Sequence, residues 1–390
     1  MSSLSLIERV KSNDPMLTFL FIGASPATER ELFSPDQISR FNVPELASQY
    51  CILCMGKKSL VLALAAHGIT APCFSEHWPG EGFCEALASN TTLTCLVMFR
   101  CELDKEEGRL FGRALALNST LQSLLMRWVT IPRGWEIGLG ESLASSSALS
   151  WVSIHMPMIG ETAGKRIGEG LARNSTLTKL NLAECQIGND GVARIVQALA
   201  GNTTLTSLIL VANGIEESAA AQIGEALVVN STLTKLILRS NFLGEAGGEI
   251  IGEALAVNST LTWLDLHCNQ IGEGGGAKLG KTLASNSTLT HLDLSKNEIG
   301  EGAGVKIGEA LAVNSTLTSL SIFLCQIGQA GGARIAAGLA VNFTLTELYF
   351  FGNHHFDPEL LESYIERNRH NSRLKSVSLL EQLFERGAWG

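Results

Sequence analysis

Two hydrophobic rhythms alternate along this chain, and together they predict one strand and one helix in each period. Leu180 and Leu182 alternate with polar neighbours, which is the pattern of a short, half-buried strand. A few residues later, Ile195 and Leu199 stand four apart and share one helical face. The same pair of patterns returns 28 residues further along, and again after that.

The period is constant over most of the chain. The tetrapeptide Asn-Ser/Thr-Thr-Leu begins at Asn90, Asn118, Asn174, Asn202, Asn230, Asn258, Asn286 and Asn314, with looser copies at Ser146 and Asn342 and a late one at Asn371. The positions equivalent to Leu177 and Leu199 are leucine in every copy from 87 to 345. No single copy can bury such a face alone, so neighbouring copies must stack.

A polar or small residue follows each predicted strand. Five residues after the Leu180 position stand Asn213, Asn241, Asn269, Asn297 and Asn353, with cysteine instead at Cys101, Cys185 and Cys325. Both residue types can bond the backbone of a tight turn, Asn strongly and Cys weakly. We therefore expect these side chains to be buried and structural.

The motif L-x-x-L-x-L-x-x-N/C-x-I with a helix in each period resembles the ribonuclease-inhibitor-like leucine-rich repeats. The longer phrase N-S-T-L-T-x-L-x-L-x-x-N-x-I-G is most similar to the repeats of NOD-like receptors. The resemblance covers about residues 59–381. It implies an α/β leucine-rich-repeat solenoid of about thirteen strands, with a parallel sheet on a concave face and helices on a convex face.

The spacing of the elements supports this curvature. Parallel strands stack about 4.8 Å apart and helices about 8–10 Å apart, so the helical side must be the longer one. A glycine recurs in the middle of the predicted helices at Gly112, Gly140, Gly168, Gly224, Gly252, Gly280 and Gly308. It lies on the flank facing the next helix, and we expect it to let adjacent helices approach closely.

Three segments follow from the limits of the repeat. Residues 1–58 form an N-terminal capping region with one divergent strand near residues 13–22, and residues 59–372 carry the repeats, starting with a strand at 60–64. Residues 373–390 are expected to add a C-terminal strand and a cap.

Composition and charge narrow the function classes. The 390 residues carry 29 Lys and Arg against 38 Asp and Glu, which disfavours nucleic acid or an anionic membrane as a general partner. The start lacks the pattern of a signal peptide, and no apolar stretch approaches the roughly 20 residues of a membrane span. Nine scattered cysteines suit a reducing compartment. We therefore expect a cytoplasmic protein.

Two motifs suggest a cofactor, and the repeat argues against both. Residues 275–282 satisfy the phosphate-loop expression G-x-x-x-x-G-K-[ST], but they belong to a predicted helix in which other copies carry Glu at the Lys281 position. Zinc-finger-like spacing relates Cys51, Cys54, His67 and Cys73. His67 falls at the Asn/Cys turn position, so a metal is not expected, although a metal-stabilised cap stays open.

Two further motifs have structural explanations. Nine N-x-[ST] triplets all lie where a helix ends, where Asn tolerates the left-handed conformation of a helix C-cap. Asp265 and Asp293 are adjacent carboxylates that could do acid–base chemistry, yet no nucleophile or pocket accompanies them. His267 and His291 are four residues out of register, too far apart to share a metal. No catalytic residue is predicted.

The side chains on the other side of the strands from the leucines predict a partner-binding surface on the concave face. They include large aromatic and basic residues that the repeat does not need for its core, the combination typical of binding hot spots. The candidates are Trp263, Tyr349, Phe323, Phe351, Lys235, Arg239, His267, His291, Trp151, Trp128 and Arg127. Trp151 and Trp128 could instead pack against the irregular N-terminal segment.

The sequence therefore predicts a non-enzymatic scaffold, without a cofactor, that recognises a protein or peptide. The resemblance implies binding along the concave face, as in ribonuclease-inhibitor-like proteins and NOD-like receptors. No nucleotide-binding module accompanies the repeats, so the roles of sensor, adaptor, inhibitor and effector stay open. A second hypothesis is a regulator of a small GTPase, because the GTPase-activating protein for Ran has the same repeat class.

Overall fold

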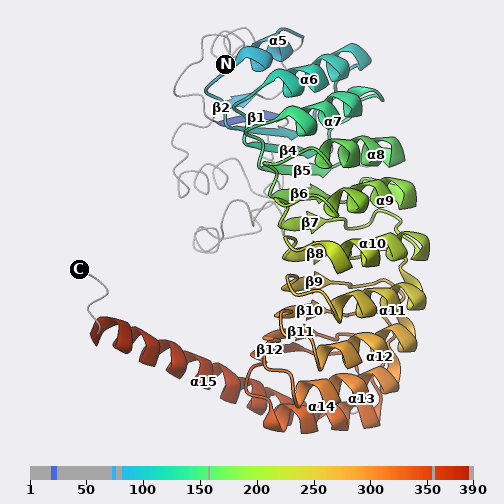
Figure 1. Ribbon diagram of the computed structural model, residues 1–390, viewed down its shortest axis with the longest axis vertical. Helices are drawn as coiled ribbons and strands as arrows, with labels where there is room; N and C mark the ends of the chain where they lie inside the picture. Colours follow the sequence, from blue (N-terminus) through green and yellow to red (C-terminus); the bar gives the residue numbers. More distant parts are fainter. Residues whose placement is uncertain (1–18, 24–72, 76–80, 157–158, 354–355, 386–390) are drawn as a thin grey trace. The chain divides into compact units, whose positions relative to one another are not determined.

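The computed structural model describes residues 19–23, 73–75, 81–156, 159–353 and 356–385, which form two compact units. Unit 1 extends to Asn213 and unit 2 begins at Gly214. In each unit the helices lie along one side of a parallel sheet (Figure 1). The predicted leucine-rich-repeat solenoid is confirmed.

Unit 1 contains seven strands and five helices among its described residues. The strands are β1 (Phe19–Gly23), β2 (Cys73–Ser75), β3 (Cys95–Phe99), β4 (Ser123–Arg127), β5 (Trp151–His155), β6 (Lys179–Leu182) and β7 (Ser207–Ile209). The helices are α5 (Glu81–Ser89), α6 (Lys105–Leu117), α7 (Trp135–Ser145), α8 (Gly160–Leu171) and α9 (Gly188–Leu199).

Unit 2 contains five strands and six helices among its described residues. The strands are β8 (Lys235–Ile237), β9 (Trp263–Asp265), β10 (His291–Asp293), β11 (Ser319–Ser321) and β12 (Glu347–Tyr349). The helices are α10 (Glu217–Val229), α11 (Gly244–Leu255), α12 (Gly272–Leu283), α13 (Gly300–Leu311), α14 (Gln329–Val341) and α15 (Pro358–Glu385).

The strand count differs from the predicted thirteen. The described residues hold twelve strands, of which β3 to β12 follow the 28-residue period. The strand predicted at residues 60–64 lies outside the described residues. The divergent first strand is present as β1, but it pairs with both β3 and β2, so the edge of the unit 1 sheet is β2. The repeat pattern did not predict β2.

The predicted C-terminal strand is wrong, because residues 358–385 form one helix, α15. Asp357 accepts a hydrogen bond from the Leu360 N–H and Pro358 starts the helix, both common at helix N-termini. Arg367 donates to the carbonyls of Leu339 and Asn342, and Asn368 donates to that of Leu345. Elsewhere in the array, side chains of the following repeat donate to the equivalent carbonyls, as Asn286 does to those of Leu255 and Asn258. At the end of the chain Arg367 and Asn368 take over this role, so the late Asn371 is not needed as a donor.

The core consists of leucine columns that run through each unit. The column of Leu177 and the column of Leu199 contain no described leucine that is more than 3% exposed. Strand leucines such as Leu180 and Leu264 are buried beside them. Each repeat thus buries its apolar face against its neighbours, as the periodicity predicts.

The N-x-[ST] asparagines are buried, which supports their structural interpretation, but the conformational reason given for them is wrong. Asn118, Asn230 and Asn342 end their helices in the extended region, at φ −75°, −75° and −85°. Asn286 shows what the side chain does instead. Its Nδ2 donates to the carbonyls of Leu255 and Asn258 in the preceding repeat, and its Oδ1 accepts from the N–H groups of Thr288 and Leu289.

The Asn/Cys position that follows the strands is buried as predicted, except at Asn353 in the last repeat, which is partly exposed. Asn269 donates to the carbonyl of Leu238 in the preceding repeat at 3.0 Å, and Cys185 and Cys325 make the equivalent contacts to Ile154 and Leu294 at 3.3 and 3.1 Å. Burial raises the pKa of the Cys185 and Cys325 thiols to about 12, so both are protonated at neutral pH.

The mid-helix glycines allow helices to pack closely, as predicted. A Cβ built on Gly168 would lie 2.6 Å from the backbone of Arg194 in the next helix, and one on Gly308 would lie 2.4 Å from that of Arg334. Because these close atoms belong to the backbone, they cannot move aside as the end of a flexible side chain could. The glycines therefore set the separation between neighbouring helices within each unit.

Replacing Asn286 with alanine should strongly destabilise the protein. The substitution leaves two carbonyls and two N–H groups of the buried turn without this partner, and we expect the free energy of unfolding to fall by about 2–3 kcal/mol. Urea denaturation followed by circular dichroism measures it. The control is Ser287→Ala at the exposed neighbour, which should change stability by less than about 0.5 kcal/mol. Equal effects of the two substitutions would contradict the role of the buried amide.

Gly168→Ala should also destabilise, although alanine has the higher helix propensity. Its methyl group would overlap the backbone of Arg194, and we expect a loss of about 1–3 kcal/mol. In Gly201→Ala the added Cβ meets nothing within 4 Å, and the change should be neutral or slightly stabilising. A stabilising effect at position 168, in thermal or urea melts, would show that the helices can separate without cost.

Candidate functional site

The candidate surface is the side of each sheet turned away from the helices, which we call the open face. In β8, β10 and β11 of unit 2, the central leucine is buried and the residues on either side of it are partly exposed. Because side chains alternate along a strand, these flanking residues point away from the leucine core. Adjacent strands pair in register, so equivalent residues of successive repeats lie side by side.

Trp263 lies in the middle of a stack on the open face of unit 2. Its neighbours in register are Lys235 on β8 and His291 on β10. The Trp263 and His291 rings are parallel within 10° with centroids 4.2 Å apart, and the Lys235 Nζ lies 4.1 Å from the Trp263 ring centroid. All three side chains are partly exposed. The indole is therefore held in one orientation while part of it still faces solvent.

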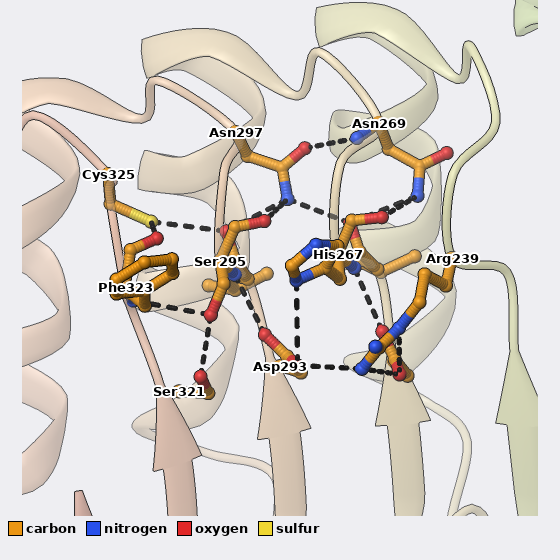
Figure 2. A network of polar contacts seen from close by, with 12 residues as sticks. Arg239, His267, Asn269, Asp293, Ser295, Asn297, Ser321, Phe323 and Cys325 are labelled. Carbon is orange, nitrogen blue, oxygen red and sulfur yellow. Dashed lines mark hydrogen bonds and ion pairs between the residues drawn. The ribbon is translucent and has the colours of Figure 1, made fainter. Parts of the chain in front are cut away.

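Two carboxylates on the same face are joined by one guanidinium. Arg239 bonds the Asp265 Oδ2 through Nε at 3.1 Å and through Nη2 at 2.9 Å, and its Nη2 lies 3.4 Å from the Asp293 Oδ2. His267 donates its backbone N–H to Asp265, and its Nδ1 lies 4.0 Å from Asp293. Figure 2 shows Arg239, His267 and Asp293 gathered at the ends of neighbouring strands.

Burial controls protonation in this cluster. It raises the pKa of the Asp265 carboxyl above its ordinary value, and the charge of Asp293 adds to this, while Arg239 acts in the opposite direction. Burial also lowers the pKa of His267 and of His291, so the neutral imidazole is favoured at neutral pH. Arg239 is the charge that allows Asp265 to ionise where it is 5% exposed.

Further along the face of unit 2, the aromatic residues are more open to solvent. Tyr349 is 53% exposed and Phe351 is 62% exposed, while Phe323 is partly exposed with the Lys296 ammonium 6.0 Å from its ring. Leu324, beside Phe323 in the chain, is 42% exposed. Phe351 stacks on the buried Phe350, which limits its motion.

Of the two tryptophans of unit 1 predicted to bind a partner, one is partly exposed and the other is buried. Trp128 is partly exposed and has two guanidinium groups near its ring, with the Cζ of Arg127 4.5 Å and that of Arg100 4.9 Å from the ring centroid. His155 lies edge-on to Trp128 and contacts Glu184 at 3.1 Å. Trp151, in contrast, is only 7% exposed, so its indole does not offer a surface to a partner. We leave Trp151 out of the surface proposed below.

The structure also places the motifs that the sequence analysis set aside. Residues 275–282 lie inside α12, so the phosphate-loop match is helical, as predicted. Cys73 begins β2, whereas Cys51, Cys54 and His67 lie outside the described residues. Three or more His, Cys, Asp or Glu side chains arranged to hold a metal ion do not occur among the described residues.

Three features of the open face were not predicted from the sequence. Asp265 and Asp293 were expected only as a possible acid–base pair, and not as partners of Arg239. Arg100 as the second cation beside Trp128 and the contact between His155 and Glu184 were not expected either. A signal was present in the constant period, because residues 26 to 29 apart lie at or just after neighbouring strands and their side chains can meet.

The comparisons agree with this architecture. A family model described as Leucine Rich repeat matches residues 173–196, 257–280, 285–308 and 313–336. Together with the stacked strands and helices, the match defines the chain as a leucine-rich repeat protein. Curated proteins provide no sequence match to it.

Two solved structures match this chain at low similarity. A chain of the yeast Rad7–Elc1 complex is 15% identical, with a TM-score of 0.42, and the match covers 72% of this chain and 75% of that one. Leiomodin-1 actin-binding site 2 is 20% identical, with a TM-score of 0.28, covering 55% of this chain and 94% of that one. Separately, none of the helices in the described residues is both long and apolar enough to span a membrane.

Arg239→Met should destabilise the protein in a pH-dependent way. Because the pKa of Asp265 is already raised, its stability contribution is largest at acid pH and decreases as pH rises through that pKa. Without Arg239 the decrease should be steeper, giving a loss of about 1 kcal/mol at pH 7 that shrinks towards pH 4. Urea denaturation across this range measures it. The double variant Arg239→Met/Asp265→Asn should lose most of the pH dependence, and a pH-independent loss in the single variant would contradict this account.

Proposed function

We propose that this chain is a non-enzymatic interaction scaffold that recognises a protein or an extended peptide on the open face of its sheet. The observation that carries the proposal is the set of aromatic side chains that unit 2 holds at exposed positions. Trp263 is fixed between a cation and an imidazole, and Tyr349 and Phe351 are more than half exposed.

The repeat itself does not require these residues. The strand positions equivalent to Trp263 carry Lys235, His291, Ser319 and Glu347 in the other repeats of unit 2. Those equivalent to Tyr349 carry Ile237, Asp265, Asp293 and Ser321. Aromatic residues at positions that accept so many side chains are best explained by a partner that covers them.

The side chains of the open face that are fixed by their neighbours also favour binding over catalysis. An indole already stacked on both sides loses little conformational entropy when a partner covers its edge. Arg239 engages both carboxylates of the cluster, so neither is poised as a general base. Lys235 lies beside the Trp263 ring and Lys296 beside the Phe323 ring, which suits a partner that brings apolar side chains flanked by carboxylates.

The finer features of the proposal follow from the sequence. The likeness of the repeats to those of NOD-like receptors supports a sensing or inhibitory role for the open face in the cytoplasm, with no cofactor. Trp128 and Arg127 in unit 1 form a second candidate contact. Regulation of a small GTPase stays the alternative, and stimulation of GTP hydrolysis by the purified protein would distinguish it.

The double variant Trp263→Ala/Tyr349→Ala should lose its partner. Each buried hot-spot aromatic contributes about 2 kcal/mol to binding, so recovery in an affinity pull-down, quantified by mass spectrometry, should fall at least about tenfold. Phe242→Ala is the matched control, because Phe242 is 54% exposed but precedes α11 and does not belong to a strand of the open face. The same proteins recovered in the same amounts with the double variant would mean that another surface binds.

A further inference from the structure

Arg127, on the open face of unit 1, has no acceptor for its side chain among the residues that the structure describes. Its Nε is buried without a hydrogen bond, and its guanidinium, which lies against the Trp128 ring, forms no ion pair there. Two other described arginines are partly exposed as Arg127 is, and both have acceptors. Arg239 bonds Asp265, and Arg367 bonds three backbone carbonyls. The described residues thus leave the charge and the N–H donors of Arg127 unused.

The repeat itself provides a comparison for this arginine. Arg127 ends β4, and Arg239 follows the end of β8 by two residues; they stand four periods of 28 residues apart, so their positions are equivalent. In both units the next repeat contributes a histidine at the same position, His155 in unit 1 and His267 in unit 2. Two carboxylates hold the arginine of unit 2 (Figure 2). Unit 1 therefore repeats the arginine and the histidine of that cluster.

Unit 1 does not repeat the two carboxylates. Asp265 and Asp293 correspond to Ser153 and Asn181, which are uncharged and buried. Asn181 keeps the structural role of Asp293, because the Oδ1 of each accepts a hydrogen bond from the N–H two residues later. The two clusters therefore differ in the negative charge beside the arginine, while the turn that follows the strand keeps its hydrogen bond.

The surroundings of Arg127 favour a negative group. The exposed Arg100 places a second guanidinium near the same indole. Burial, together with the charge of Arg127, lowers the pKa of His155, so its neutral form is favoured at neutral pH. Glu184 contacts His155 at 3.1 Å, and no ion pair joins it to Arg127 in the described part of the chain. Residues 95–135 carry six Lys and Arg against four Asp and Glu, although the whole chain has a net charge of −9. Charge complementarity thus indicates an anionic occupant.

We propose that Arg127 binds a carboxylate of the protein partner, an Asp or Glu side chain that supplies the charge which Asp265 supplies to Arg239. This carboxylate belongs to the partner of the open face, so the inference rests on the proposed function. A planar carboxylate accepts from two N–H groups of one guanidinium at once. It also balances the single charge of Arg127, whereas a phosphate group would bring a second negative charge towards Glu184. Apolar side chains beside the acidic residue can then cover the exposed part of the Trp128 ring.

Two synthetic peptide libraries measure the preference for a carboxylate. Both have the form X-X-Z-X-X, with Z fixed as Glu in one and Gln in the other, and with Asp and Glu excluded from the X positions. The full-length protein should bind the immobilised Glu library roughly tenfold more tightly, because a charge-assisted hydrogen bond replaces a neutral one. Nonspecific attraction acts in the opposite direction, since the chain is acidic. Arg127→Met should make the binding of the two libraries equal.

A second variant tests the same site while Arg127 stays in place. Ser153→Asp supplies from within the chain the carboxylate that Asp265 supplies in unit 2, so it should abolish the preference for Glu. Ser153→Asn is the matched control, because its side chain has the same size without the charge, and it should keep the preference. Arg133→Met removes an exposed arginine that is close in the sequence and should also keep it. Circular dichroism checks that every variant is folded.

Equal binding of the Glu and Gln libraries to wild type, or binding of neither, would overturn the proposal. A preference for Glu that survives Arg127→Met or Ser153→Asp in the folded protein would overturn it as well. A third library with phosphoserine at Z that binds more tightly than the Glu library would identify phosphate as the occupant and exclude the carboxylate. Failure of the proposed function gives a different result, because Trp263→Ala/Tyr349→Ala would then recover the same proteins as wild type, whatever the ratio between the libraries.

Discussion

The architecture depends on a hydrogen-bonded amide that recurs in successive repeats, with one exception, where the Ser146 hydroxyl accepts from the N–H groups of the turn instead. Between each helix and the following strand, the backbone turns in a space that excludes water, and its polar groups need partners. The carboxamide of Asn286 provides four hydrogen bonds at once, two to the N–H groups of its own turn and two to carbonyls 28 and 31 residues earlier. A change of even one residue in the spacing would move the donor away from these carbonyls. The bond thus favours a constant period, and a constant period aligns the leucines of successive repeats in columns.

The sequence predicted the parts of the fold that depend on neighbouring repeats. Leu177, Leu199 and Gly168 occupy columns whose surroundings are the same in every copy, so one copy informs the next. Predictions failed where the surroundings change. The late Asn371 matches the tetrapeptide, but Arg367 and Asn368 already bond the carbonyls of the last repeat, and the chain stays helical. The reason offered for the asparagines was also incomplete, because their burial and hydrogen bonding, and not a left-handed backbone, favour this residue.

The candidate site was predictable only in part, for the same reason. In-register pairing follows from the constant period, so Lys235, Trp263 and His291 could be placed on adjacent strands from their numbers alone. The reach of a long side chain could not. Arg239, two residues after the end of β8, reaches carboxylates on the next two strands, and this depends on its rotamer and on the burial of Asp265. The burial of Trp151 could not be predicted from the sequence either, because a tryptophan suits both a partner contact and internal packing.

The turn between each helix and the next strand separates the open face from the helical side of the repeat. Val257 and Trp263 are only six residues apart, yet the buried Asn258 lies between them and fixes the backbone of the turn through its bonds to the preceding repeat and to the Leu261 N–H. In a repeat array, stability is close to a sum of terms from each repeat and its neighbours, so substitutions at exposed positions of the strands leave the helical side nearly unchanged. The residues of the open face can therefore vary to suit a partner without disturbing the stack that holds them.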